Sequence, residues 1–138
     1  MTGKLKSQKA EIGSQNGFSL LELMIAMFIM IILISVAVPT YERSVRHAKE
    51  TVLKQNLWQM RAQIDRYAAD KGKLPKNIDD LVTGKYLREK PIDPIREDSE
   101  WDEEMGDDPN STESEQGLKD VHSKAEGTDT EGVEYSKY

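Results

Sequence analysis

The feature that most constrains this chain is an unbroken apolar segment near its N-terminus, residues 18–38. Its sequence is FSLLELMIAMFIMIILISVAV, in which Glu22 is the only charged residue. As an α-helix the segment spans about 31 Å, which is enough to cross a hydrocarbon core of about 30 Å. A chain of 138 residues, of which 32% are charged, has little apolar surface to bury such a helix on every side. The segment is therefore predicted to span a membrane.

The charges that follow this segment are segregated along the chain. Residues 39–94 carry a net charge of +4, whereas residues 95–138 hold 15 Asp and Glu against four Lys and Arg, a net charge of −11. The total of −6 argues against a nucleic-acid partner, for which a basic face is expected. The chain has no cysteine, which excludes a disulfide framework, a thiol nucleophile and any Cys-ligated metal centre.

A secretory signal peptide is the competing interpretation of the apolar segment. Residues 35–37, Ser-Val-Ala, would supply a small-x-small cleavage site and release a soluble acidic protein that begins at Val38. Glu22 argues against this interpretation, because a charge inside a membrane helix costs roughly 2.5–3.5 kcal/mol on insertion scales. A simple export signal gains nothing from that cost. Basic residues lie on both sides of the segment, so the positive-inside rule does not choose its orientation.

The residues around Glu22 resemble the type IV prepilin motif. A short basic leader, residues 1–17, ends in the sequence GFSLLE, residues 17–22, which opens the long apolar segment. In that family a prepilin peptidase of the membrane cuts after the glycine and methylates the new N-terminal phenylalanine. The resemblance implies cleavage between Gly17 and Phe18 and N-methylation of Phe18. It also implies a role in assembly for Glu22 and for Pro39, which matches a proline common in the N-terminal helix of the family.

Physical chemistry explains why these residue types are found at Gly17, Phe18 and Glu22. Gly17 has no side chain, so an extended backbone can approach a protease closely there. After cleavage, the ammonium group of Phe18 lies in a poorly solvated place and needs a negative partner. We expect Glu22 of one subunit to meet the Phe18 ammonium of its neighbour in a filament and to set the register, because losing one partner leaves the other charge unpaired. The alternative is that Glu22 extends its carboxylate to the membrane interface.

The helix is predicted to continue beyond the membrane through residues 39–71 as an amphipathic segment. Apolar residues recur at helical spacing along one face: Leu53, Leu57, Met60, Ile64 and Tyr67. This face is predicted to pack on the C-terminal domain. Glu50 and Lys54 belong to an i,i+4 series of charged residues that we place on another face. Gly72 and the following Pro75 predict the end of the helix.

Residues 72–138 are predicted to form a small acidic domain with short strands between residues 100 and 136, which gives an α+β fold. Asn77 is a candidate N-cap for a short helix over residues 78–82, and Trp101 is a candidate core residue. The order Leu-Pro at 74–75, Asp-Asp-Leu-Val at 79–82 and Pro-Ile-Asp-Pro at 91–94 is similar to the major pseudopilins of type II secretion.

This second resemblance implies a structural role in protein secretion. Such a subunit would assemble through its N-terminal helix into a short periplasmic filament that drives protein export. Its partners would be the prepilin peptidase, further copies of itself, other pseudopilins, the secretion platform and its ATPase, and membrane lipid. It would cross the bacterial cytoplasmic membrane once, with its C-terminal domain in the periplasm. A type IV pilin for adhesion, motility or DNA uptake is the alternative within the family, and an exported acidic binding protein is the alternative outside it.

Two interpretations compete for the C-terminal loop, and neither involves catalysis. The resemblance implies a calcium ion there, with oxygen ligands from Ser123, Glu126 and Asp129. The composition favours a solvated acidic tail instead, because residues 95–138 combine a strong negative charge with few apolar residues. We find no glycine-rich phosphate loop and no carboxylate pair in a recognisable frame. A structural subunit is therefore expected rather than an enzyme.

Overall fold

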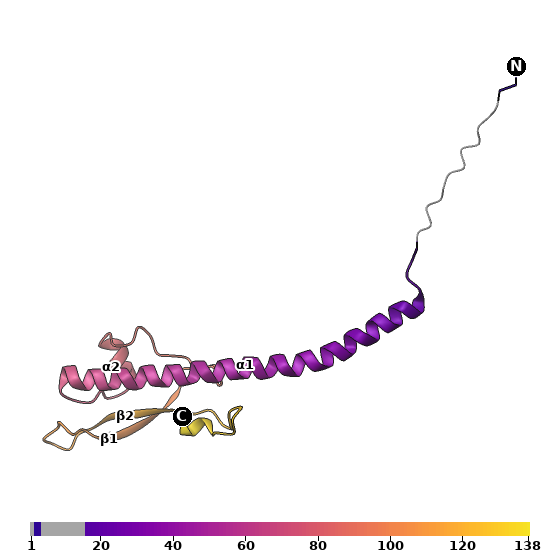
Figure 1. Cartoon of the computed structure of the whole chain (residues 1–138). Coiled ribbons are helices and arrows are strands. Elements are labelled where there is room, and N and C mark those ends of the chain that lie inside the picture. Colours follow the sequence, from indigo (N-terminus) through magenta and orange to yellow (C-terminus); the bar gives the residue numbers. More distant parts are fainter. Residues whose placement is uncertain (1, 4–15) are drawn as a thin grey trace. The chain divides into compact units, whose positions relative to one another are not determined.

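The computed structural model describes residues 2–3 and 16–138, so most of the predicted leader, residues 1–17, lies outside the described residues. The chain divides after Val38 into two units, of which the second is Pro39–Tyr138. The elements in chain order are α1 (Leu20–Lys71), α2 (Ile78–Thr83), β1 (Trp101–Asp107), β2 (Gln116–Ser123) and the 3-10 helix η1 (Tyr135–Lys137). The fold is α+β, as the sequence predicts, with a long N-terminal helix and a small C-terminal domain (Figure 1).

Helix α1 has a recognisable cap at each end. Ser19 precedes the first turn, and its Oγ accepts a hydrogen bond of 3.1 Å from the backbone N–H of Glu22. This bond satisfies one of the N–H groups that a helix start leaves without a partner. At the other end, Gly72 adopts a positive φ of 68° and its N–H donates to the carbonyl of Ala68 at 2.9 Å. Glycine is the residue that adopts this conformation without strain. Pro39 lies inside the helix.

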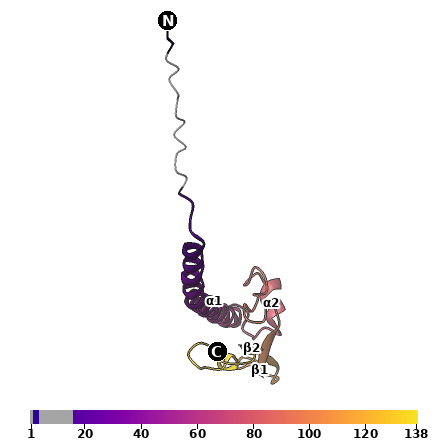
Figure 2. The ribbon, with the colours of Figure 1, turned by 90° about the vertical axis from the view of Figure 1, so that its right-hand side faces the viewer.

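The core of the second unit forms where α1 faces the short elements that follow it. Figures 1 and 2 show α2 and the β1–β2 hairpin beside the part of α1 that belongs to this unit. The buried apolar residues are Leu53, Leu57, Met60 and Ile64 of α1, Ile78 and Leu81 of α2, and Leu87, Trp101, Leu118, Val121, Ala125 and Tyr135. The predicted apolar face of α1 is therefore the face that packs on the C-terminal domain.

Short-range signals in the sequence explain the small elements. Asn77 caps α2, because its side-chain oxygen accepts a hydrogen bond from the N–H of Asp80 at 2.9 Å. Strands β1 and β2 pair antiparallel from Trp101 opposite Ser123 to Asp107 opposite Gln116, with one irregularity after Glu104. Only glycine fits at position 117, since an added Cβ would lie 2.4 Å from the Cβ of Leu74.

Candidate functional site

The predicted cleavage point lies outside α1 and is open to solvent. Gly17 and Phe18 precede the first helical residue, and both are exposed. Nothing lies within 4 Å of the position that a Cβ on Gly17 would occupy, and Phe18 is 87% exposed. A protease needs a segment of backbone that is neither helical nor covered. The peptide bond between Gly17 and Phe18 meets both conditions.

Glu22 lies in the first turn of α1, where the cap formed by Ser19 places it. The two residues have the Ser-x-x-Glu spacing of a capping box, and the N–H of Glu22 donates to Ser19 Oγ. A carboxylate in this turn is favoured by the partial positive charge at the helix N-terminus. The sequence analysis gave Glu22 a role but missed Ser19, although the spacing alone was a sufficient signal. We name Gly17, Phe18, Ser19 and Glu22 the processing segment.

From Leu23 to Val38, α1 presents mostly apolar side chains around its whole surface. Every residue from 20 to 48 is exposed in the single chain. By length and composition, α1 contains a window apolar enough to cross a membrane, and none of that window is buried. A signal sequence near the N-terminus would pass the same test. Apolar surface of this extent is typical of a membrane or protein interaction site, and the described part of the chain does not cover it.

The comparison with protein families favours a retained membrane helix over a signal sequence that is cut off behind it. Residues 12–38 match the prokaryotic N-terminal methylation motif. The chain carries a prepilin-type N-terminus. The match covers Gly17, Phe18 and Glu22 and extends to the last residue of the predicted membrane span. No curated protein and no solved structure matches the chain significantly.

A prepilin-type N-terminus has direct consequences for processing. It implies cleavage by a prepilin peptidase in front of the apolar helix, so the helix stays attached to the mature protein. The motif and the exposed helix together fit a single-pass membrane anchor. They also support a pilin-like subunit that assembles into a filament.

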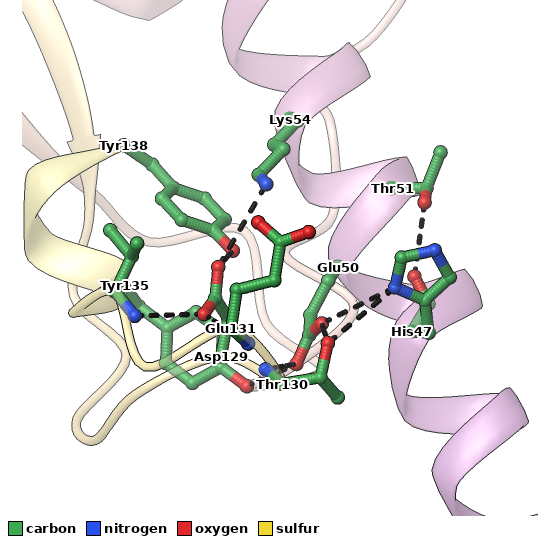
Figure 3. A network of polar contacts seen from close by, with 10 residues as sticks. His47, Glu50, Thr51, Lys54, Asp129, Thr130, Glu131, Tyr135 and Tyr138 are labelled. Atoms are coloured by element: carbon green, nitrogen blue, oxygen red, sulfur yellow. Dashed lines mark hydrogen bonds and ion pairs between the residues drawn. The ribbon is translucent and has the colours of Figure 1, made fainter.

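The C-terminal segment is folded against α1, so the expectation of a solvated acidic tail was wrong. Ala125, Asp129 and Tyr135 are all buried, with exposed fractions of 5–7%. We name the contacts of this segment with α1 the C-terminal loop network; its members are Glu50, Lys54, Asp129, Thr130, Tyr135 and Tyr138 (Figure 3). The composition gave the wrong expectation because Glu50 and Asp129 accept hydrogen bonds from specific groups of the protein. A count of charges does not reveal such hydrogen bonds.

Asp129 accepts hydrogen bonds at both of its carboxylate oxygens. Its Oδ1 accepts from the backbone N–H groups of Glu131 and Val133, each at 2.8 Å. Its Oδ2 accepts from the hydroxyl of Tyr138 and lies 3.8 Å from the Nζ of Lys54. The hydrogen bond from Tyr138, followed by those from the two backbone groups, lowers the pKa of Asp129 below its ordinary value. Burial and the same hydrogen bond raise the pKa of Tyr138.

Glu50 is the second buried carboxylate of the network and the largest departure from the sequence analysis. It was placed in a series of charged residues on a face other than the buried apolar one, yet only 3% of it is exposed. Its Oε1 accepts from the N–H of Thr130 and from the hydroxyl of Tyr135, each at 3.0 Å, and its Oε2 accepts from the hydroxyl of Thr130 at 2.8 Å. Burial, then the bond to Glu50, raises the pKa of Tyr135. The helical spacing of charges does not reveal these partners, because they lie 80 or more residues away.

The three residues proposed as calcium ligands are used in different ways. Ser123 is buried; its hydroxyl donates to Oδ2 of Asp93 at 2.5 Å and accepts from the N–H of Ala125. Asp129 belongs to the C-terminal loop network. Glu126 is exposed. Two of the three are thus engaged with donors and acceptors of the protein itself.

A second polar cluster, which the sequence analysis did not anticipate, joins the hairpin to α1. Within the described part of the chain, Glu104, Asp120 and His122 place their side-chain ligand atoms within 4.8 Å of one another. The Nε of Arg61 donates to Oδ1 of Asp120 at 2.6 Å. The Nη2 of the same guanidinium group donates to the main-chain oxygen of Tyr138. We interpret this cluster as an ion-pair network that connects the end of the C-terminal segment to the helix.

Proposed function

We propose that the chain is a structural pseudopilin subunit of a type II secretion system, which assembles through its N-terminal helix into a short periplasmic filament. The observation that carries this proposal is the processing segment, which lies at the start of the exposed apolar part of α1. The absence of cysteine favours a pseudopilin over pilins that close a C-terminal disulfide loop. A structural role, rather than catalysis, is part of the proposal.

The mechanism follows from the residues of the processing segment. A prepilin peptidase cuts at the exposed bond after Gly17, and methylation modifies the new amino group of Phe18. Before assembly, the mature subunit resides in the cytoplasmic membrane, with residues 18–38 in lipid and its C-terminal domain in the periplasm. On assembly, the apolar helices exchange lipid for one another, and Glu22 meets the Phe18 ammonium of a neighbouring subunit. Pro39 follows the span, where we propose that it adapts the helix to packing in the filament.

The partners proposed from this mechanism are those of a secretion machine. They are further copies of the chain, other pseudopilins, and the platform protein and ATPase that extract the subunit from the membrane. A growing filament of this kind would push folded exoproteins outward. Nucleic acid is not among the proposed partners, because the periplasmic domain carries most of the negative charge.

The first test is mass spectrometry of the N-terminus of the protein taken from its native membrane. A chain that begins at N-methylated Phe18 supports prepilin processing. A chain that begins at Val38 identifies an exported soluble protein, and the roles proposed for Glu22 and Pro39 then fail. A full-length, uncleaved chain also contradicts the proposal.

The test of assembly is the substitution Glu22→Ala. We expect the variant to be inserted and cleaved like the wild type but to form no filaments, because the Phe18 ammonium loses its partner. Glu42→Ala, which removes an exposed carboxylate from the same helix beyond the span, is the matched control and should assemble. The readouts are the N-terminal mass and electron microscopy of sheared filaments. Normal filaments from Glu22→Ala would contradict the ion-pair mechanism.

A deletion of the gene separates secretion from a surface pilus, which is the alternative within the family. Loss of exoprotein secretion with no change in surface filaments supports the pseudopilin. Loss of long surface filaments, together with adhesion, motility or DNA uptake, supports a pilin instead.

A further inference from the structure

The C-terminal loop network joins two distant parts of the chain through two buried carboxylates. Glu50 comes from α1 and Asp129 from the loop between β2 and η1. Each carboxylate accepts three hydrogen bonds, two of them at a single oxygen. Buried charges require partners of this number and quality, because the interior solvates them poorly. The loop therefore depends on groups that neutralise and orient these two side chains.

Lys54 of α1 provides a cation beside Asp129. The Nζ of Lys54 lies 3.8 Å from Oδ2 of Asp129 and 4.6 Å from the centre of the Tyr138 ring. Lys54 thus lies beside both members of the hydrogen bond that joins Tyr138, the residue after η1, to Asp129 of the loop (Figure 3). A cation over an aromatic face is attracted by the ring electrons, which adds to its attraction to the carboxylate.

This arrangement does not fit the calcium ion that the resemblance to pseudopilins implies. A calcium ion takes six to eight oxygen ligands, which a loop of this kind supplies through carboxylates and carbonyls. Asp129 already accepts three hydrogen bonds, two at Oδ1 and one at Oδ2, and a carboxylate has about four lone-pair sites, so the site left for a metal ion is on Oδ2, where Lys54 lies. A divalent cation there would lie beside the Lys54 ammonium, and like charges repel. The hydroxyl of Ser123 donates to Asp93, and its oxygen accepts from the N–H of Ala125.

We propose that the Lys54 ammonium takes the place of a bound divalent cation in this protein, so that the C-terminal loop closes on α1 without calcium. The loop is held by the Tyr138 hydroxyl, the two backbone donors and Lys54 around Asp129, and by Thr130 and Tyr135 around Glu50. The folded state then does not depend on the calcium concentration of the compartment. This proposal concerns the second unit and does not rest on the role of the chain in secretion.

The test compares thermal unfolding of the full chain in detergent micelles, with excess calcium and with a calcium chelator. We expect the same Tm in both conditions, and no binding heat when calcium is titrated into the protein. The substitution Lys54→Met keeps an unbranched apolar side chain that is one heavy atom shorter than lysine, and it removes the charge. We expect it to lower Tm by about 3 °C or more, and by the same amount with calcium and with the chelator.

Lys49→Met is the matched control on the same helix. Lys49 also forms an ion pair, at 3.3 Å, but its partner Glu97 has a side chain that is 76% exposed, against 1% for Asp129. An exposed pair contributes little, so Tm should change by less than about 1 °C. A rise in the wild-type Tm with calcium, at a concentration where magnesium has no effect, overturns the proposal. So does a Lys54→Met variant that is as stable as Lys49→Met.

Discussion

The two halves of α1 are built from the same kinds of apolar residue but differ in where those residues find their partners. Leu33, in the first half, is 63% exposed, whereas Leu57, in the second, is 1% exposed. The second half is covered by α2, the hairpin and the C-terminal loop, all of which belong to the same chain. The first half has no such cover among the described residues. The second half of α1 therefore forms part of the core of the C-terminal domain, whereas the first half leaves its apolar side chains exposed.

The acidic residues of the two halves differ in the same way. Glu50 is buried and accepts hydrogen bonds from Thr130 and Tyr135, which are residues of its own chain. Glu22 is exposed in the single chain, and its proposed partner is the amino group of another subunit. A carboxylate with partners inside the chain stabilises the fold, whereas one with partners outside it acts only on assembly. The predictions below test this distinction, from the largest expected effect to the smallest.

The largest effect is expected from truncating the buried half of the apolar surface. Leu57→Ala should lower the free energy of unfolding by about 2–5 kcal/mol, because it removes buried methyl groups and leaves a cavity. The matched variant Leu33→Ala should leave unfolding of the second unit unchanged, since Leu33 does not contribute to that core. Urea unfolding of the full chain in micelles, followed by the fluorescence of buried Trp101, measures both. Equal losses for the two variants would contradict the division of α1 into two roles.

An intermediate effect is expected from Glu50→Ala. The hydroxyl of Tyr135 and the N–H of Thr130 lose their acceptor, and an unsatisfied buried donor costs about 1–3 kcal/mol. Glu22→Ala should not change the stability of the second unit, although we expect it to abolish assembly. The two glutamates thus give opposite results in the same pair of assays, unfolding and filament formation. A Glu50→Ala variant with wild-type stability would show that the hydrogen bonds of Glu50 do not stabilise the folded protein.

The smallest effect is a dependence of stability on acid pH. The pKa of Asp129 is lower in the folded protein than its ordinary value of 3.8, first because Tyr138 donates to it and also because Lys54 lies nearby. A lowered folded pKa means that this stabilisation is fully present above the unfolded pKa and is lost as the pH falls through the folded pKa. The free energy of unfolding should therefore decrease as the pH is lowered from about 4. Unfolding at a series of pH values measures this decrease.

The control for the acid effect is Asp129→Asn, which keeps the shape of the side chain and removes the titrating group. It should be less stable at neutral pH, and its stability should fall less steeply in acid. Asp98 also has a lowered pKa, through its hydrogen bond with Arg96, so part of the decrease remains in the variant. An unchanged slope in Asp129→Asn would assign the whole acid effect to other carboxyl groups.

Signals that act over a few residues were sufficient to predict much of this molecule. The end of α1 before Gly72, the cap at Asn77 and the buried face from Leu53 to Ile64 follow from helix periodicity and local hydrogen bonding. The position of the processing segment follows in the same way, because the motif is contiguous and begins the apolar run. Such features depend on spacing along the chain and need no knowledge of which segments meet in space.

The C-terminal loop could not be predicted by the same reasoning. Its composition is that of a solvated tail, and Glu50 fits a surface series of charges equally well. What decides the outcome is that Asp129, Thr130 and Tyr135 come to lie beside α1 once the hairpin has packed. Burial and pairing are properties of contacts between segments, which neither composition nor periodicity records.

The sequence by itself determined that this chain has a membrane-length apolar helix with a prepilin-type start and an α+β domain behind it. These are consequences of hydrophobic length, periodicity and a contiguous motif. Only the tertiary structure decided that Glu50 is buried and that Lys54 forms an ion pair with Asp129. The reason is physical: a charge is stabilised by whatever donors and counter-ions surround it, and folding brings those groups together from distant parts of the chain.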